Sequence, residues 1–338
     1  MTGDGFKMTE RIVLEKEKKL SWSFLKKCCF GYASVFMLLL FFKRPTDTAQ
    51  WVERGLSVCV ERLIPSLFPF MIVSALLLSS GIGELLGKIF AKPFGALFGI
   101  GAQGSASLLL GWLCGFPIGA RSASRLYREG KISGEEYERI VCISGTPSPA
   151  FLINVAGAAM LGEAKKGIAL YIICLLSCAA VGMVMKNFGR AECGGAPTVC
   201  EKKKGDGIAI AFTRAVTEST TGMLCVCGFV VFFSAFVGAL DGFLSSVMGD
   251  SAIADAIFGF FEITVGLTRI TSAGISAPLT FILCAAASAW SGLSVHLQVI
   301  SLCSDTVFPI SRYFLANLAK SAVGALLALA CLPLLRVL

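Results

Sequence analysis

The stretch SGTPSP (Ser144–Pro149) places glycine, two prolines and small hydroxyl residues inside an apolar segment of helix length. A second such stretch, SGLSVH (Ser291–His296), begins 147 residues later, and the glycines that close the upstream stretches GFPIG (Gly115–Gly119) and EITVG (Glu262–Gly266) are also 147 residues apart. In lipid, a broken helix leaves backbone N–H and C=O groups unpaired, and each unpaired group costs several kcal/mol. Matched breaks in two halves of an apolar chain therefore predict a transporter whose binding site lies where the breaks meet.

The composition is that of a membrane protein. The chain has 338 residues, of which 55% are hydrophobic and 15% charged, and its mean hydropathy is +0.77, whereas a soluble domain has about 25% charged residues. Since roughly 20 apolar residues cross a bilayer, the long uncharged runs predict an all-α polytopic membrane protein. These runs are Leu63–Gly83, Pro93–Ala120, Ile140–Gly162, Gly167–Met185, Ser219–Leu240 and Ile270–Ser304.

Basic residues gather in three polar segments, 1–27, 121–139 and 186–204, whereas the connection Asp241–Asp255 is acidic. Cytoplasmic loops of membrane proteins are rich in Lys and Arg, so we expect the three basic segments inside and the acidic connection outside. The formal net charge of +8 thus indicates a lipid bilayer, and not a nucleic acid, as the partner.

The run Cys28–Phe42 follows basic residues but has no small-residue cleavage site after it, so we expect a first transmembrane helix rather than a signal peptide. The predicted organisation is a basic cytoplasmic tail (1–27), a first transmembrane helix (28–44), a first repeat (50–187), a polar linker (188–207) and a second repeat (208–338).

Charge bias and repeat together predict an inverted structural repeat with broken and re-entrant helices. Pro93–Ala120 must enter and leave on the basic side, which its glycine-rich centre (Gly99–Gly104) permits, and Gly242–Arg269 is expected to dip in from the acidic side. The resulting topology has seven crossings and two re-entrant segments, with eight crossings as the alternative. The amphipathic segments Gln50–Arg62 and Ile208–Glu218 are expected either to lie in the membrane interface or to extend the helices that follow them.

Two ionisable residues fall inside the repeated motifs. A carboxylate at Glu262 is expensive in an apolar segment, about 2.5–3.5 kcal/mol on insertion scales, so we expect it to act as a coupling site for a proton or cation, or else to reach the interface and pair with Arg269. His296 is the only histidine. It is expected either to relay protons and recognise a carboxylate, or to bond across helices.

The residues around the breaks are the candidate substrate site. Pro147 and Pro149 remove backbone donors, and the helix that resumes after Pro149 presents unpaired N–H groups that favour an anion. The candidate binding residues are Ser144, Gly145, Thr146, Ser148 and Asn154 in the first repeat and Ser291, Gly292, His296 and Gln298 in the second. The residues expected to break the helices are Gly115, Pro117, Gly119 and Gly266.

Signatures of enzymes are missing from the sequence. One histidine cannot form the His-Glu-x-x-His metal motif, and neither a Gly-x-Ser-x-Gly elbow nor a P-loop is present. Cys193 and Cys200 lie on a polar loop without a second pair or a histidine, so we expect free thiols rather than a metal site. The sequence predicts no catalysis, cofactor or metal, and it leaves a homo-oligomer possible.

Four ordered tracts resemble the YlbJ family of sporulation integral membrane proteins, within the nucleoside-recognition or gate domain superfamily. They are Leu67–Phe70, Gly115–Ala120 followed by Arg125, Leu126 and Gly130, Phe261–Thr264 followed by Gly266, and Trp290–His296 followed by Gln298. The resemblance covers roughly residues 50–335.

The resemblance implies an inverted repeat with re-entrant hairpins and passage of a small carboxylate, dipicolinic acid, across the outer forespore membrane. A nucleoside or cation carrier, or an accessory protein of spore formation that does not transport, is the alternative.

The charge pattern generates a prediction about topology. Single cysteines at positions 130 and 203 of a cysteine-free variant should react with an impermeant thiol reagent from the same side of the membrane, and a cysteine at position 250 from the other. Labelling of positions 130 and 203 from opposite sides would contradict the inverted repeat.

Overall fold

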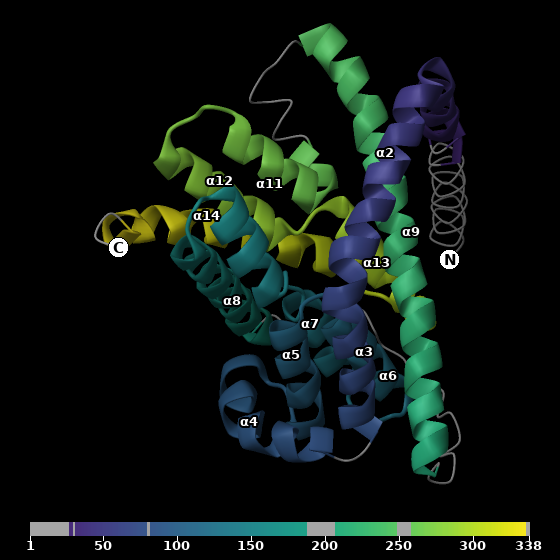
Figure 1. The fold of residues 1–338 in the computed structure, drawn as a ribbon. Helices are drawn as coiled ribbons and strands as arrows, with labels where there is room; N and C mark the ends of the chain where they lie inside the picture. Colours follow the sequence, from purple (N-terminus) through teal and green to yellow (C-terminus); the bar gives the residue numbers. More distant parts are fainter. Residues whose placement is uncertain (1–26, 30, 80–81, 188–206, 249–257, 336–338) are drawn as a thin grey trace, which may run out of the picture.

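The computed structural model describes residues 27–29, 31–79, 82–187, 207–248 and 258–335, and every regular element in these ranges is a helix (Figure 1). The first repeat contains α2 (Pro45–Val58), η1 (Cys59–Leu63), α3 (Ile64–Ser79), α4 (Ile82–Phe98), α5 (Ala102–Cys114), α6 (Ile118–Arg128), α7 (Gly134–Ile143), η2 (Phe151–Met160) and α8 (Ala164–Asn187). The second contains α9 (Ile208–Met248), α11 (Ile263–Ser272), α12 (Ala277–Trp290), α13 (Leu293–Leu302) and α14 (Ile310–Leu335).

The helix boundaries repeat with the offset of the sequence motifs. α7 ends at Ile143 and α12 at Trp290, which are 147 residues apart. α8 begins at Ala164 and α14 at Ile310, within one residue of the same offset. Gly115 and Pro117 lie between α5 and α6, Ser144–Pro149 lies between α7 and η2, and Ser291 and Gly292 lie between α12 and α13. The prediction that Gly119 and Gly266 break helices is wrong, because Gly119 lies within α6 and Gly266 within α11.

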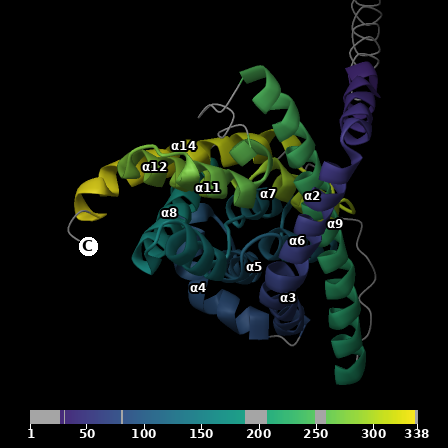
Figure 2. The ribbon, with the colours of Figure 1, turned by 45° about the horizontal axis from the view of Figure 1, so that its top comes forward.

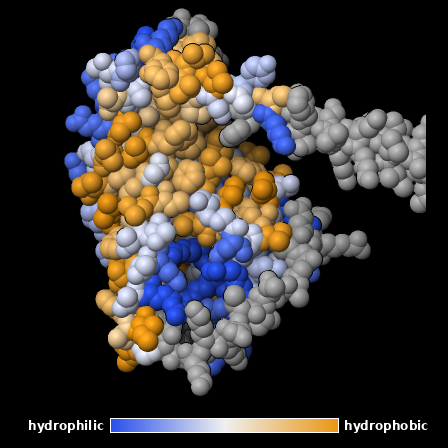
Figure 3. Space-filling view, turned by 90° about the vertical axis from the view of Figure 1, so that its right-hand side faces the viewer, coloured by the Kyte–Doolittle hydropathy of each residue, from blue (hydrophilic) through white to orange (hydrophobic). Residues whose placement is uncertain are grey.

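Several helices are suited to a bilayer. Four described helices are long and apolar enough to cross a membrane, and the number rises to six if each of two bent pairs is one span. The predicted seven crossings are not all unbroken helices, because Ile140–Gly162 is divided between α7 and η2. Large apolar side chains are exposed along α9 and α14, such as Leu224 and Leu326, and Figure 3 shows an apolar surface over much of one face.

The long helix α9 lies antiparallel to the continuous helical path from α2 through η1 to α3 (Figures 1 and 2). α9 has 41 residues and is about 60 Å long at the rise of an α-helix. The contacts of Trp51 with Gly238 and of Gly55 with Val231 show the antiparallel course. Of the two alternatives for the amphipathic segments Gln50–Arg62 and Ile208–Glu218, the structure has the helical extension.

A sharp bend lies at the glycine-rich centre of Pro93–Ala120. α4 and α5 meet there at 89°, and basic side chains hold the bend, since the Gly99 carbonyl accepts from Arg139 at 3.0 Å and the Ala96 carbonyl from Lys186 at 2.5 Å. A second hairpin is formed by α5 and α6, and its tip is the Gly115–Pro117 break. Glycines allow this close pairing, because a Cβ on Gly119 would lie 2.7 Å from the Gly111 Cα. The re-entrant course of Pro93–Ala120 stays a prediction.

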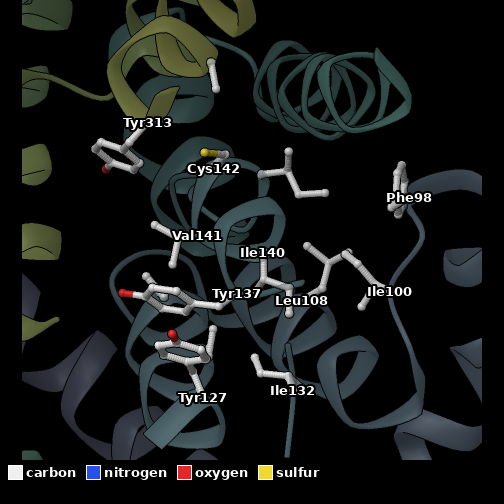
Figure 4. Packing of buried hydrophobic residues seen from close by; sticks show 14 of the residues in the cluster. Phe98, Ile100, Leu108, Tyr127, Ile132, Tyr137, Ile140, Val141, Cys142 and Tyr313 are labelled. Carbon is white, nitrogen blue, oxygen red and sulfur yellow. The ribbon is translucent and has the colours of Figure 1, made fainter. Parts of the chain in front are cut away.

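The largest apolar core, shown in Figure 4, is formed mainly by the first repeat, and the second repeat adds Val299, Cys303, Tyr313 and Ala316. Tyr127 and Tyr137 stack there with ring centroids 4.9 Å apart. Ion pairs join the two repeats near this core, since Arg128 contacts Asp305 at 2.7 Å and Arg312 contacts Glu138 at 2.5 Å.

Close packing of α2 on α9 generates a prediction about stability. A Cβ on Gly238 would lie 2.1 Å from the Trp51 ring, so Gly238→Ala should lower the free energy of unfolding by about 1–3 kcal/mol. Gly228→Ala on the same helix is the matched control, because a Cβ there meets nothing within 4 Å. Thermal unfolding in detergent measures both variants, and equal stability of the two would contradict the predicted clash.

Candidate substrate site at the helix breaks

The first break leaves carbonyl groups that the helix itself cannot pair. In a continuous helix, the carbonyls of Ile143 and Gly145 would accept from the N–H groups of residues 147 and 149, and both of these are prolines. The structure supplies other donors. Trp112 Nε1 donates to the Ile143 carbonyl at 2.9 Å, and Lys320 Nζ donates to the Gly145 carbonyl at 2.9 Å.

The two breaks of the first repeat contact one another. The Phe116 backbone N–H donates to the Thr146 carbonyl at 2.9 Å, and a Cβ on Gly115 would lie 2.8 Å from the backbone nitrogen of Ser148. Gly115 has a φ of +82°, so glycine is needed there both for conformation and for space. The hydroxyl of Ser148 then accepts from the Phe151 N–H at 3.2 Å as the chain resumes its helical course.

The breaks of the second repeat also contact one another. Glu262 precedes α11, and its carboxylate accepts from the Val265 N–H at 2.8 Å as the N-cap. Trp290, the last residue of α12, donates from Nε1 to the Phe260 carbonyl at 3.0 Å. Ser291 and Gly292 have φ values of +76° and +86°, and a Cβ on Gly292 would lie 3.0 Å from the Ile263 nitrogen.

One cavity of about 280 Å³ is lined by residues of both sets of breaks. Ser148 and Asn154 reach it from the first repeat, and Glu262 and Gln298 from the second. Most of the remaining wall is apolar, contributed in part by the α2–α9 pair. The structure thus brings four of the sequence-predicted site residues to one space.

The other candidate binding residues do not line the cavity, and all of them except the half-buried Gly145 are buried. Ser144 Oγ, Thr146 Oγ1 and His296 Nε2 are buried without a hydrogen-bond partner in the described part of the chain. His296 Nδ1 lies 2.9 Å from the Tyr313 hydroxyl, and its ring lies 4.4 Å from that of Trp290. The Ser291 hydroxyl donates to the Ser288 carbonyl at 3.1 Å.

The alternative in which Glu262 pairs with Arg269 is wrong. Arg269 contacts Asp241 at 2.6 Å instead, and its guanidinium lies 4.2 Å from the ring centroid of Phe258. Glu262 is only 7% exposed and faces the cavity. Its carboxylate is held by the α11 N-terminus, where a negative charge is favoured.

Lys320 is a residue of this region that the sequence analysis missed. It is 1% exposed in the middle of α14, and its Nζ reaches the first break from the second repeat. The sequence could have identified Lys320 as a candidate, because it is the only charged residue between Tyr313 and Leu335. A charged residue inside a transmembrane segment is a functional candidate by default.

Cysteine and metal chemistry are not prominent in this site. Within the described ranges, no three His, Cys, Asp or Glu side chains come together in a way that could hold a metal ion. The predictions for Cys193 and Cys200 fall outside the described residues.

The fold and the exposed apolar helices define a polytopic helical membrane protein. The chain is 27% identical over 325 residues to the sporulation integral membrane protein YlbJ of Bacillus subtilis (strain 168), a match that covers 86% of this chain and 79% of that protein. This similarity, which extends over most of both chains, supports the assignment of the chain to the YlbJ family. No family model matches the chain, and no solved structure matches it.

The two break glycines should respond differently to substitution. Gly292→Ala forces a side chain to a φ of +86° and close to Ile263, so we expect a loss of about 1–2 kcal/mol or more. Gly145→Ala should be better tolerated, because the nearest atom to a Cβ there is Lys320 Nζ at 3.8 Å. Thermal unfolding of both variants checks this order, and a larger loss for Gly145→Ala would contradict the described break geometry.

Proposed function

We propose that the protein is a transporter of a small carboxylate and that the cavity between the helix breaks is its substrate site. The observation that carries the proposal is the placement of Ser148 and Asn154 from one repeat opposite Glu262 and Gln298 from the other around one space. Transporters built on repeats bind substrate at such an interface of discontinuous helices. The volume of about 280 Å³ suits a small molecule, since it lies at the lower end of typical ligand pockets.

The polar groups of the cavity suggest how a carboxylate is held. Asn154 and Gln298 carry amide donors, and Ser148, Ser234 and Thr264 carry hydroxyls, so five neutral polar side chains line the cavity and can donate to carboxylate oxygens. Glu262 is the only charged residue among those that line the cavity. An ionised Glu262 repels an anion, so the carboxylate substrate must enter with a proton on Glu262. Substrate and proton then move together, which makes Glu262 the coupling residue.

Family membership supports the identity of the substrate and the setting. The relative is named a sporulation integral membrane protein, and the family resemblance implies dipicolinic acid as the cargo. The protein would then move this dicarboxylate across the outer forespore membrane, without catalysis and without a bound cofactor. The bilayer and the small carboxylate are its proposed partners.

Glu262 also favours a second candidate function. A carboxylate in an otherwise neutral cavity attracts a cation, so a cation carrier or a carrier of nucleosides with a coupled cation is the competing proposal. The two proposals differ in the effect of charge removal. A carrier of carboxylates should tolerate a neutral residue at position 262 for binding, whereas a cation carrier should lose binding altogether.

The experiment is uptake of radiolabelled dipicolinate by liposomes that contain the purified protein, with an imposed proton gradient. We expect uphill accumulation by the wild type. Glu262→Gln retains an oxygen for the Val265 N–H and should still bind dipicolinate, but it should not accumulate dipicolinate above equilibrium, because the coupling proton is lost. Wild-type uptake should decrease as the pH rises, since less of the carboxyl is protonated.

Glu163→Gln is the control, because this exposed acid lies on the loop before α8 and pairs with Lys166 at 2.6 Å. It should transport like the wild type. A Glu262→Gln variant with normal accumulation and an unchanged pH profile would remove Glu262 from coupling. Absence of uptake by the wild type, with every substrate tried, would favour a non-transporting accessory protein.

A further inference from the structure

Lys320 is a buried cation without a carboxylate partner. It is among the largest fully buried side chains of the described residues, and its Nζ donates to the Gly145 carbonyl at 2.9 Å. No ion pair within the described ranges includes it. A buried charge is costly unless polar groups stabilise it, so the environment of Gly145 must offer that stabilisation.

The first break is built to hold a positive charge. α7 ends at Ile143, and its C-terminus presents the negative end of the helix dipole. The Gly145 carbonyl beyond it lacks a backbone donor because residue 149 is proline. Ser144 and Thr146, on either side of Gly145, each have a buried hydroxyl oxygen without a partner. Helix C-termini and unwound carbonyls of this kind are where transporters bind their coupling cation.

The second repeat shows why only one break needs this charge. The Gly292 carbonyl, which corresponds to that of Gly145, accepts from the His296 N–H at 3.3 Å. The residue that corresponds to Lys320 in the first repeat is Ile173, 147 residues earlier on α8, and it is buried in an apolar cluster. The ammonium is therefore present only opposite the break whose carbonyl the prolines have freed.

We infer that Lys320 is the resident cation of the first break, and that its ammonium occupies the position at which a dissolved monovalent cation would otherwise bind. The break is then complete without sodium or potassium. Removal of the Lys320 side chain then creates a vacant site for a monovalent cation. This inference concerns binding at Gly145 and holds whether or not the protein transports dipicolinate.

The test is thermal unfolding of the purified full-length protein in detergent, with sodium, potassium or choline chloride at constant ionic strength. We expect the Tm of the wild type to be the same in all three salts. Lys320→Ala should have a lower Tm in choline, and sodium or potassium should raise it by about 5 °C through binding to the folded state. Ile173→Ala is the matched control, since it removes a buried side chain at the equivalent position and should respond to no cation.

Lys320→Met keeps most of the volume but carries no charge, so it should be less stable than the wild type in every salt. This variant keeps the inference testable if Lys320→Ala does not fold. A Lys320→Met protein as stable as the wild type would overturn the inference, because the break would then need no cation. A wild-type Tm that rises with sodium, or a folded Lys320→Ala protein indifferent to both cations, would overturn it as well.

Discussion

The requirement that backbone groups in lipid find partners within the chain governs this structure. The helix breaks free C=O groups, and four of these carbonyls accept hydrogen bonds from residues at other positions in the described chain. Trp112 and Lys320 donate to the carbonyls that the prolines free, Phe116 donates to Thr146, and Trp290 donates to Phe260. The breaks persist because partners from distant parts of the chain hold them together in pairs.

The two repeats meet this requirement with different residues, and the difference assigns them different roles. The break of the first repeat contains prolines, which leave carbonyl oxygens without backbone donors. The Lys320 side chain of the second repeat donates to one of these oxygens. The second repeat keeps its backbone donors and uses residues with positive φ, Ser291 and Gly292, to turn the chain. There a carboxylate, Glu262, caps the helix that follows. A cation at one break and an acid at the other give the repeat interface an electrical asymmetry that two identical halves would lack.

Local sequence rules predicted the breaks and their repeat well, because glycine and proline act through backbone geometry that depends little on tertiary context. They also predicted that Glu262 belongs to the site. They did not reveal what holds the glycine-rich bend, because Arg139 lies 40 residues from Gly99 and Lys186 lies 90 residues from Ala96. Lys320 was missed because its partner is 175 residues away, and sequence spacing does not reveal such a contact.

The arrangement of the cavity walls indicates which parts must move for a substrate to enter and leave. The break residues form one side of the cavity and are fixed by the hydrogen bonds described above. The other side is formed by Gly55 and Val58 of α2 and by Val230 and Ser234 of α9. α2 and α9 pack on each other through Gly55 and Gly238, which leaves no room for sliding. If the cavity is the substrate site that we propose, we expect access to it to require movement of the α2–α9 pair against the broken helices.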